Sequence, residues 1–110
     1  MAYDEVLAER IRDVLGPRDG VVEKKMFGGL AFLLHGNMCC GVTGDELMVR
    51  VEPDRTAELL DEPHTRPFDM TGRPMKGWLV VGSAGVGDDE ALERWVELGV
   101  AFASSLPAKK

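Results

Sequence analysis

The stretch that decides the fold is Lys24–Val51, KKMFGGLAFLLHGNMCCGVTGDELMVRV. Two pairs of turn-forming residues divide it, Gly36-Asn37 and Gly44-Asp45. Glycine, Asn and Asp accept the positive φ that two-residue hairpin loops require. The apolar runs between and beside these turns are therefore interpreted as three consecutive antiparallel strands, Leu30–Leu34, Met38–Val42 and Leu47–Val51.

The second turn predicts a register for the second hairpin. If Gly44-Asp45 is a two-residue loop, Val42 faces Leu47 and Cys40 faces Val49. Residues that face each other across antiparallel strands point to the same side of a sheet. These four apolar side chains are therefore expected on one face.

The first turn is less decisive. If Gly36-Asn37 is also a two-residue loop, Ala31 and Leu33 join the face of Cys40, and a second set occupies the other face: Leu30, Phe32, Leu34, Cys39 and Met48. A longer loop would shift the middle strand by one residue and exchange the two sets. In either register both faces carry apolar side chains, so we expect part of one face to be covered by C-terminal segments or left for a partner.

Amphipathic helices are expected at both ends of the chain. Leu7, Ile11 and Leu15 recur at helical spacing within Tyr3–Leu15, and Gly16-Pro17 ends that helix. The other expected elements are a strand at Val21–Phe27, a short helix at Ala57–Leu60, strands at Arg66–Met70 and Met75–Val81, and a helix starting at Asp88. The prediction is a single domain, residues 1–110, of α+β class. Its antiparallel sheet has about five to six strands around a central meander and carries an N-terminal, a short middle and a C-terminal helix.

The composition is that of an acidic protein. Its 110 residues contain 13 Lys and Arg against 19 Asp and Glu, for a net charge of −6. This charge repels DNA and anionic membranes at long range, so no direct nucleic-acid binding is expected. We find no signal-peptide pattern and no apolar run near the ~20 residues of a membrane span, and we expect a cytoplasmic protein.

The two cysteines, Cys39 and Cys40, are adjacent. Neighbouring cysteines rarely form a disulfide, which favours a reducing compartment. Successive strand residues point to opposite faces, so we expect the two thiols not to converge on one metal ion, even with His35 or His64 nearby. No metal and no cofactor are expected. One thiol is expected to be exposed and open to oxidation, and the sequence leaves open which.

No motif names a reaction. The glycine-rich loop Gly82–Gly87 precedes a helix, but it lacks a P-loop lysine, and three acids, Asp88-Asp89-Glu90, occupy the place where a phosphate would bind. No serine, histidine and carboxylate stand at the spacing of a known triad motif. The sequence therefore predicts a protein that is not an enzyme.

Several short motifs resemble the N-terminal domain of the TfoX/Sxy family of competence regulators. They are Lys24–Leu30 (KKMFGGL), Gly36–Met38, Asp45–Val51, Pro67-Phe68 and Pro74-Met75 with Trp78. The resemblance implies an α+β domain and a link to transcriptional control of natural competence. Larger family members act as co-activators and carry a second, C-terminal domain, whereas this chain is expected to be the stand-alone domain.

The candidate contact residues combine the glycine pair with nearby basic and aromatic side chains. They are Lys25, Met26, Phe27, Gly28, Gly29, Arg50, Lys76 and Trp78. Adjoining glycines in a strand predict a bulge or a close approach of two backbones. We predict a non-enzymatic, regulatory protein-interaction module that binds a protein partner, or a second copy of itself, through an exposed sheet face. The alternative is a small-molecule-binding or enzymatic domain with a groove near Phe27, Gly28, Gly29 and Trp78.

Overall fold

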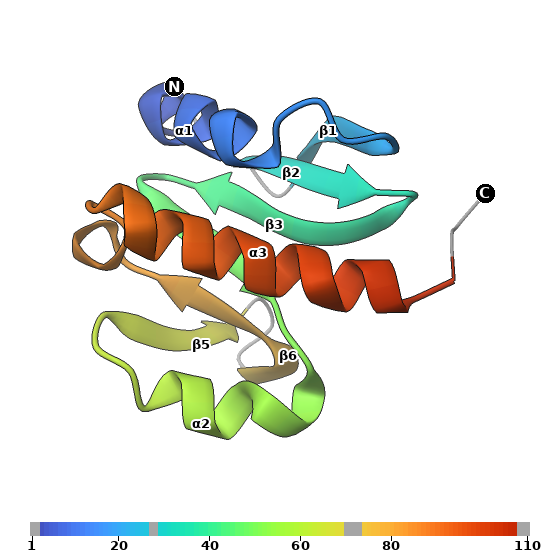
Figure 1. The fold of residues 1–110 in the computed structure, drawn as a ribbon. Helices are drawn as coiled ribbons and strands as arrows, with labels where there is room; N and C mark the ends of the chain where they lie inside the picture. The colour runs from blue at the N-terminus through green and yellow to red at the C-terminus, as the bar shows by residue number, and fades with distance from the viewer. Residues whose placement is uncertain (1–2, 27–28, 70–73, 108–110) are drawn as a thin grey trace.

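A computed structural model describes residues 3–26, 29–69 and 74–107, and within these ranges the chain forms one six-stranded antiparallel sheet (Figure 1). The strands are β1 (Val21–Met26), β2 (Gly29–Leu34), β3 (Asn37–Thr43), β4 (Glu46–Arg50), β5 (Thr65–Asp69) and β6 (Pro74–Val81). Their order across the sheet is β1-β2-β3-β4-β6-β5. The predicted α+β class, central meander and strand number are confirmed.

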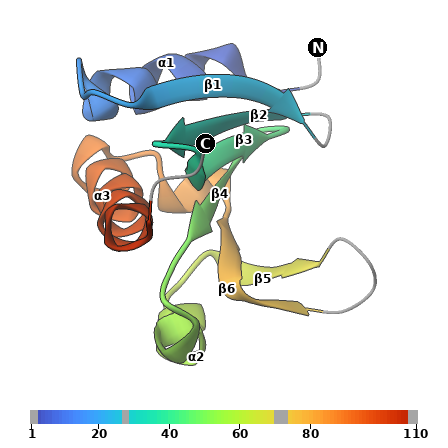
Figure 2. The ribbon, with the colours of Figure 1, turned by 90° about the vertical axis from the view of Figure 1, so that its right-hand side faces the viewer.

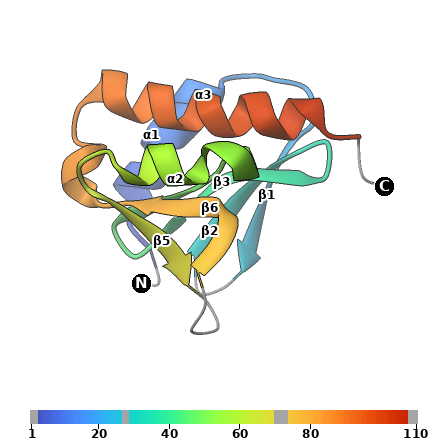
Figure 3. The ribbon, with the colours of Figure 1, turned by 90° about the horizontal axis from the view of Figure 1, so that it is seen from below.

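The α-helices of the described ranges lie on one side of the sheet (Figures 2 and 3). They are α1 (Glu5–Leu15), α2 (Thr56–Leu60) and α3 (Asp89–Ser105), and two 3-10 turns, η1 (Pro53–Arg55) and η2 (Ser83–Gly85), precede α2 and α3. α3 packs on β2, β3 and β4, α1 lies against α3, and α2 contacts β5 and β6. The opposite side of the sheet, which we call the helix-free face, has no helix from the described residues.

Local sequence explains where the two longer helices begin. The Asp4 side chain accepts hydrogen bonds from the backbone N–H groups of Val6 and Leu7, at 2.9 and 3.3 Å, and Asp88 caps α3 through the N–H of Glu90 at 3.1 Å. Side-chain caps of this kind satisfy N–H groups that have no partner within the helix. The apolar stripes of both helices then meet the sheet as the periodicity predicts.

Gly99 allows α3 to pack directly on the backbone of β3. A Cβ built at Gly99 would lie 2.2 Å from the carbonyl oxygen of Cys39 and 3.2 Å from a methyl group of Val49. Only a residue without a side chain permits this approach. Gly99 thus brings the backbone of α3 into direct contact with the backbone of β3.

The β3–β4 hairpin has the predicted register. Val42 pairs with Leu47 and Cys40 with Val49 across a loop of Gly44 and Asp45. Gly44 has φ +57°, and a glycine with positive φ at the first loop position is typical of a type II′ turn. The residues of this turn were sufficient to predict the register of the hairpin.

The predicted two-residue loop at Gly36-Asn37 is wrong. Leu34 pairs with Asn37, so the loop consists of His35 and Gly36, at φ 52° and 85°. Asn37 is instead buried in β3, where its side-chain amide donates to the carbonyl oxygen of Pro107 at 2.9 Å. A contact with the C-terminal segment, 70 residues away in sequence, thus accompanies the shifted loop.

A β-bulge completes the difference between prediction and structure. Leu33 pairs with Met38 while Phe32 pairs with Cys40, so Cys39 is the extra residue of β3. The shift places three side chains of β2 on the helix-covered face, where all three belong to the main core: Leu30, Phe32 and Leu34. Ala31 and Leu33, predicted on that face, point to the helix-free face.

Candidate functional site

The centre of the helix-free face is buried although no described helix covers it. Ala31, Met48 and Val80 are 0%, 1% and 2% exposed, and the pairs Met48↔Val80 and Ala31↔Gly41 place them on that side. These three residues are not part of the core cluster beneath the helices. They form a second, smaller apolar layer.

Two methionines cover this layer. A Cβ built at Gly41 would lie 3.0 Å from the terminal methyl of Met48 and 3.1 Å from that of Met38. Both side chains therefore lie over the glycine, where the sheet has no side chain of its own. Methionine suits this role because its unbranched side chain adapts to an irregular surface.

Apolar side chains also reach solvent around this layer. Val22 of β1 is 59% exposed, and it lies across from Leu33 in the ladder. Four half-buried side chains continue the apolar surface across the sheet: Leu33, Met38, Phe68 and Trp78. The Phe68 and Trp78 rings are 6.0 Å apart, a spacing typical of packed aromatic pairs. An apolar surface of this kind is a candidate interaction site.

The charges of the helix-free face differ from those of the whole chain. By strand register its described charged side chains are Lys24, Glu46, Arg50 and Arg66, three basic and one acidic. Arg66 forms an ion pair with Glu46, and this hydrogen bond holds the pKa of the Glu46 carboxyl below its usual value. A face with a small positive charge thus lies on a protein of net charge −6.

Arg50 and Trp78, both predicted as contact residues, come together. They are direct partners across β4 and β6, and the guanidinium carbon of Arg50 is 5.6 Å from the centroid of the Trp78 ring. The same carbon is 5.2 Å from the centroid of the Phe102 ring, on α3. Cation–π contacts over both rings hold the Arg50 head group at one end of the sheet.

The other predicted contact residues do not join this group. Lys25 is paired with Leu30, so it lies on the helix-covered side of the edge strand β1. By strand geometry it is about 14 Å across the sheet and about 10 Å along it from Arg50. Met26 ends β1 and Lys76 lies within β6, whereas Phe27 and Gly28 lie outside the described residues. The proposed grouping of all eight residues is therefore not seen.

Gly29 has a structural reason to be glycine. A Cβ at this position would lie 2.0 Å from the carbonyl oxygen of Val42, so the close backbone approach predicted for the glycine pair is confirmed at Gly29. Gly29 and Trp78 stand at opposite ends of the ladder, on strands separated by β3 and β4. These two residues are therefore separated across the sheet, and the other two residues named for the groove of the small-molecule alternative, Phe27 and Gly28, lie outside the described residues.

The prediction that the two thiols point apart is wrong. Because Cys39 is the bulged residue, its Sγ atom lies 3.9 Å from that of Cys40, and both belong to the core under the helices. A bulge interrupts the alternation of side chains along a strand. The expectation of one exposed thiol is also wrong, since the two residues are 1% and 0% exposed.

The pKa values of the two thiols are shifted in opposite directions. The hydrogen bond with Cys40 lowers the pKa of the Cys39 thiol, and nearby Arg18 adds to this effect. The same hydrogen bond, together with burial, raises the pKa of Cys40. The Cys39 thiol also donates to the carbonyl oxygen of Phe32 at 3.3 Å, which holds it inside the core.

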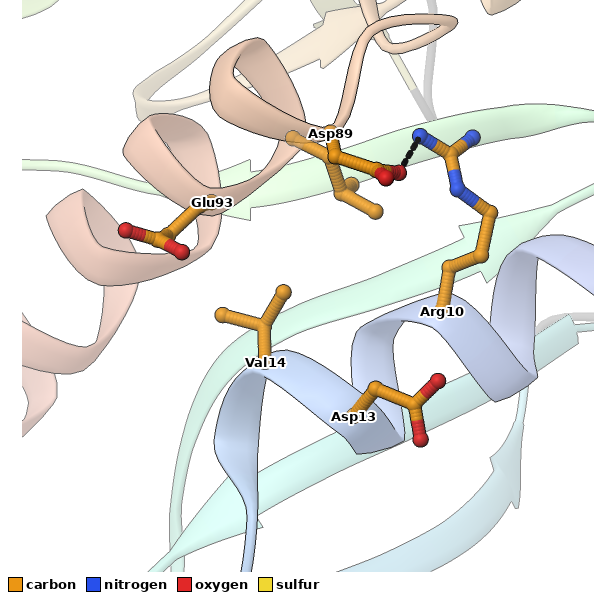
Figure 4. Close-up of a pocket in the computed structure, with 6 residues that line it drawn as sticks. Arg10, Asp13, Val14, Asp89 and Glu93 are labelled. Atoms are coloured by element: carbon orange, nitrogen blue, oxygen red, sulfur yellow. Dashed lines mark hydrogen bonds and ion pairs between the residues drawn. The ribbon is translucent and has the colours of Figure 1, made fainter.

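An acidic hollow of about 230 Å³ lies between α1 and α3 (Figure 4). Arg10 crosses it to pair with Asp89 at 3.0 Å and to donate to the carbonyl oxygen of Gly87 at 3.3 Å. Asp13 and Glu93 project from the two helices on either side of Val14 (Figure 4). The ion pair joins α1 to the start of α3, which makes the hollow a feature of helix packing.

No metal-binding group is found in the described part of the chain: nowhere there do three or more His, Cys, Asp or Glu side chains converge on one point. His35 and His64 are both exposed and both have positive φ, in turns outside the sheet centre. Within residues 3–26, 29–69 and 74–107, no helix is both long enough and apolar enough to cross a membrane.

Comparison with protein families connects this fold with the sequence motifs. The family model described as the TfoX N-terminal domain matches residues 13–103, which include the whole sheet and most of α3. The chain belongs to the TfoX N-terminal domain family. No curated protein and no solved structure matched the sequence.

The matched region includes the helix-free face of this TfoX N-terminal domain, with Arg50, Phe68 and Trp78, and also Phe102 of α3. Sequence reasoning missed Phe68 and Phe102 as members of the site. Phe68 stands only within one of the family motifs, and no motif includes Phe102. Its position beside Arg50 depends on where the helix ends against the sheet, which helical periodicity does not predict.

Proposed function

We propose that this TfoX N-terminal domain is a non-enzymatic interaction module that binds a protein partner through the helix-free face of its sheet. Family membership supports a regulatory role for this interaction, and the resemblance to competence regulators favours a link to transcriptional control of natural competence. The observation that carries the proposal is the second apolar layer, with Val22 exposed at its margin and Trp78 and Phe68 half-exposed.

The charge of the face favours a particular kind of partner. Its described basic side chains outnumber its acidic ones, so a partner surface that combines apolar and acidic residues is complementary. A second copy docked face to face would bring the basic groups of both copies together, which costs free energy. Lys24 and Lys25 on the edge strand β1 likewise discourage edge-to-edge pairing. We therefore place another acidic protein, rather than a second copy, on this face.

Site-specific photo-crosslinking in cells tests the proposal. A benzoylphenylalanine replaces Val22, which is 59% exposed on the helix-free face, and in a matched control it replaces Val6, which is 70% exposed on α1. We expect crosslinked species from position 22 that are missing from position 6, and mass spectrometry would then identify an acidic protein. A component of a transcription complex among the adducts would support the regulatory link.

Three outcomes would overturn this interpretation. Equal adduct patterns from positions 22 and 6, or none from either, would show that the face has no dedicated partner. Adducts consisting only of a second copy of the chain, supported by a dimer in sedimentation, would replace the acidic partner by self-association. A mobility shift of DNA at low salt that disappears in Lys24→Glu would point to nucleic acid instead.

A further inference from the structure

Arg50 differs from the other arginines that the structure describes. The other six each form an ion pair with a carboxylate: Arg10, Arg12, Arg18, Arg55, Arg66 and Arg94. No carboxylate among the described side chains pairs with Arg50. Its guanidinium contacts two aromatic rings instead, at 5.6 Å from the Trp78 centroid and 5.2 Å from the Phe102 centroid.

The contacts with the Trp78 and Phe102 rings hold the Arg50 guanidinium in a position suited to binding an anion. The rings restrict the position of the guanidinium, so little rotational freedom remains to be lost on binding. Aromatic rings offer no oxygen acceptor, so the N–H donors of Arg50 are not used by Trp78 or Phe102. A fixed guanidinium fork with available donors binds a carboxylate through two parallel hydrogen bonds.

A groove lined by apolar side chains and by the charged Glu52 and Arg55 lies beside this group. It has a volume of about 140 Å³ and separates the C-terminal half of α3 from η1 and α2. Its lining is Val51, Glu52, Arg55, Leu59, Leu98, Ala101 and Phe102. Phe102 lines the groove and also contacts the Arg50 guanidinium. Val51, which follows Arg50 directly in the chain, lines the groove as well. A side chain in the groove would thus sit next to the guanidinium.

The volume of the groove sets the size of its occupant. A cavity of about 150 Å³ lined by apolar side chains accommodates a molecule the size of benzene. The groove is similar in volume and therefore suits one aliphatic or aromatic side chain. Arg50, which reaches the groove through its contact with Phe102, favours a side chain that is followed closely by a negative charge.

We propose that Arg50 and the groove bind a segment of the partner protein in which one aliphatic side chain, inserted beside Phe102, stands next to a carboxylate that Arg50 receives. This inference rests on the proposed function and specifies the chemistry of its partner. It adds that recognition extends from the helix-free face, at Trp78, around the end of the sheet to α3.

A fragment that carries only these two features tests the site directly. N-acetyl-L-leucine has an aliphatic side chain and a free carboxylate, and N-acetyl-L-leucinamide has the same side chain without the charge. Both are titrated into the ¹⁵N-labelled full chain and followed by NMR chemical-shift changes. For a ligand of this size we expect the acid to bind with a dissociation constant on the order of millimolar. The shifts should centre on Arg50, Trp78 and Phe102.

Three variants make the test specific. Arg50→Gln removes the charge, and we expect binding of the acid to weaken by about tenfold, to the level of the amide. Arg50→Lys keeps the positive charge but not the two parallel N–H donors, so its affinity for the acid should lie between those of wild type and Arg50→Gln. Arg94→Gln is the matched control, because Arg94 also lies over an aromatic ring, at 4.9 Å from the Trp95 centroid, but is paired with Glu62.

The inference is overturned if the acid and the amide bind equally, if Arg50→Gln binds the acid like wild type, or if Arg94→Gln loses binding as strongly as Arg50→Gln. Thermal unfolding of each variant shows whether a loss of binding reflects a loss of fold, and Arg50→Lys supplies a milder variant should Arg50→Gln unfold. The crosslinking result at Val22 is interpreted independently of the fragment binding. Fragment binding without a crosslinked partner would contradict the proposed function alone, and a crosslinked acidic partner without fragment binding would contradict this inference alone.

Discussion

The two faces of the sheet are closed in different ways, and neighbouring residues of β4 show the difference. Leu47 is 0% exposed on the helix-covered face, within a core of branched and aromatic side chains. Met48 points the other way and is 1% exposed although no described helix covers it. A small residue, Gly41, and two flexible methionine side chains close the helix-free face. The covered face is packed by helices and the helix-free face by adaptable side chains that a partner could extend.

The largest effect is expected from Gly99, where the covered face is tightest. Gly99→Val would place a Cβ 2.2 Å from the Cys39 carbonyl oxygen, so α3 must move away from β3. The backbone cannot move aside as the end of a side chain can, and we expect a loss of about 4–5 kcal/mol in the free energy of unfolding. Urea denaturation measures it. Gly87→Ala is the control, since its Cβ would meet only the Ser83 carbonyl oxygen, at 3.8 Å, and a change above about 1 kcal/mol there would undermine the explanation.

The next largest loss of stability is expected from neighbouring residues of β4 that point to opposite faces of the sheet. We expect Leu47→Ala to cost about 3–4 kcal/mol, because it leaves a cavity between sheet and helices. Met48→Ala should cost about 2 kcal/mol, because Met38 can move into part of the space. Chemical denaturation of both variants gives the two values. If Met48→Ala changed stability by less than about 0.5 kcal/mol, the second apolar layer would not contribute to the fold.

A smaller effect is expected from acid, through ion pairs on both sides of the sheet. Hydrogen bonds from Arg12, Arg66 and Arg94 lower the pKa values of Glu23, Glu46 and Glu62, respectively. A carboxyl whose pKa is lowered by folding stabilises the native state above its unfolded pKa, about 4.3 for Glu, and this contribution is lost as the pH falls through the folded value. After allowance for solvent screening, each pair contributes a few tenths to about 1 kcal/mol.

Urea midpoints between pH 6 and pH 3 would show this loss, and 1 M NaCl should reduce it because these groups are partly exposed. The variant in which Glu23, Glu46 and Glu62 are all replaced by Gln should flatten the profile. An unchanged profile in that variant would mean that other carboxylates govern the acid response.

The smallest effect is expected at the margin of the helix-free face. Val22→Thr keeps a β-branched side chain on an exposed edge-strand site, so stability should change by no more than about 0.5 kcal/mol. Val6→Thr, at 70% exposure on α1, provides the comparison. Thermal unfolding measures both variants. A loss above about 1.5 kcal/mol in Val22→Thr would assign Val22 to the fold rather than to a binding surface.

The two hairpins show how far turn chemistry predicts a register. The Gly44-Asp45 loop produced the correct β3–β4 pairing because its flanking strands pair without a bulge. The Gly36-Asn37 prediction failed because Asn37 bonds to Pro107 and the loop moves to His35 and Gly36. No signal near residue 37 indicates that contact, and none marks Cys39 as the bulged residue.

The candidate site was predicted in part for the same reason. Arg50 and Trp78 were selected from their residue types and motif positions, and the structure places them together. Phe102 joins them from α3, 52 residues after Arg50, so the contact depends on how the helix crosses the sheet. Lys25 was assigned to the same group, but strand register places it on the other side of the sheet, far from Arg50.

The amino-acid sequence by itself determined the helices, the strands, the second hairpin and membership of the TfoX N-terminal domain family. These features depend on periodicity, turn residues and motifs that act over a few neighbouring residues. Tertiary structure alone decided which side chains of β2 enter the core, that the sulfurs of Cys39 and Cys40 meet at 3.9 Å, and that Arg50 rests against two aromatic rings. Such contacts join segments distant in sequence, and their geometry follows from packing the whole chain.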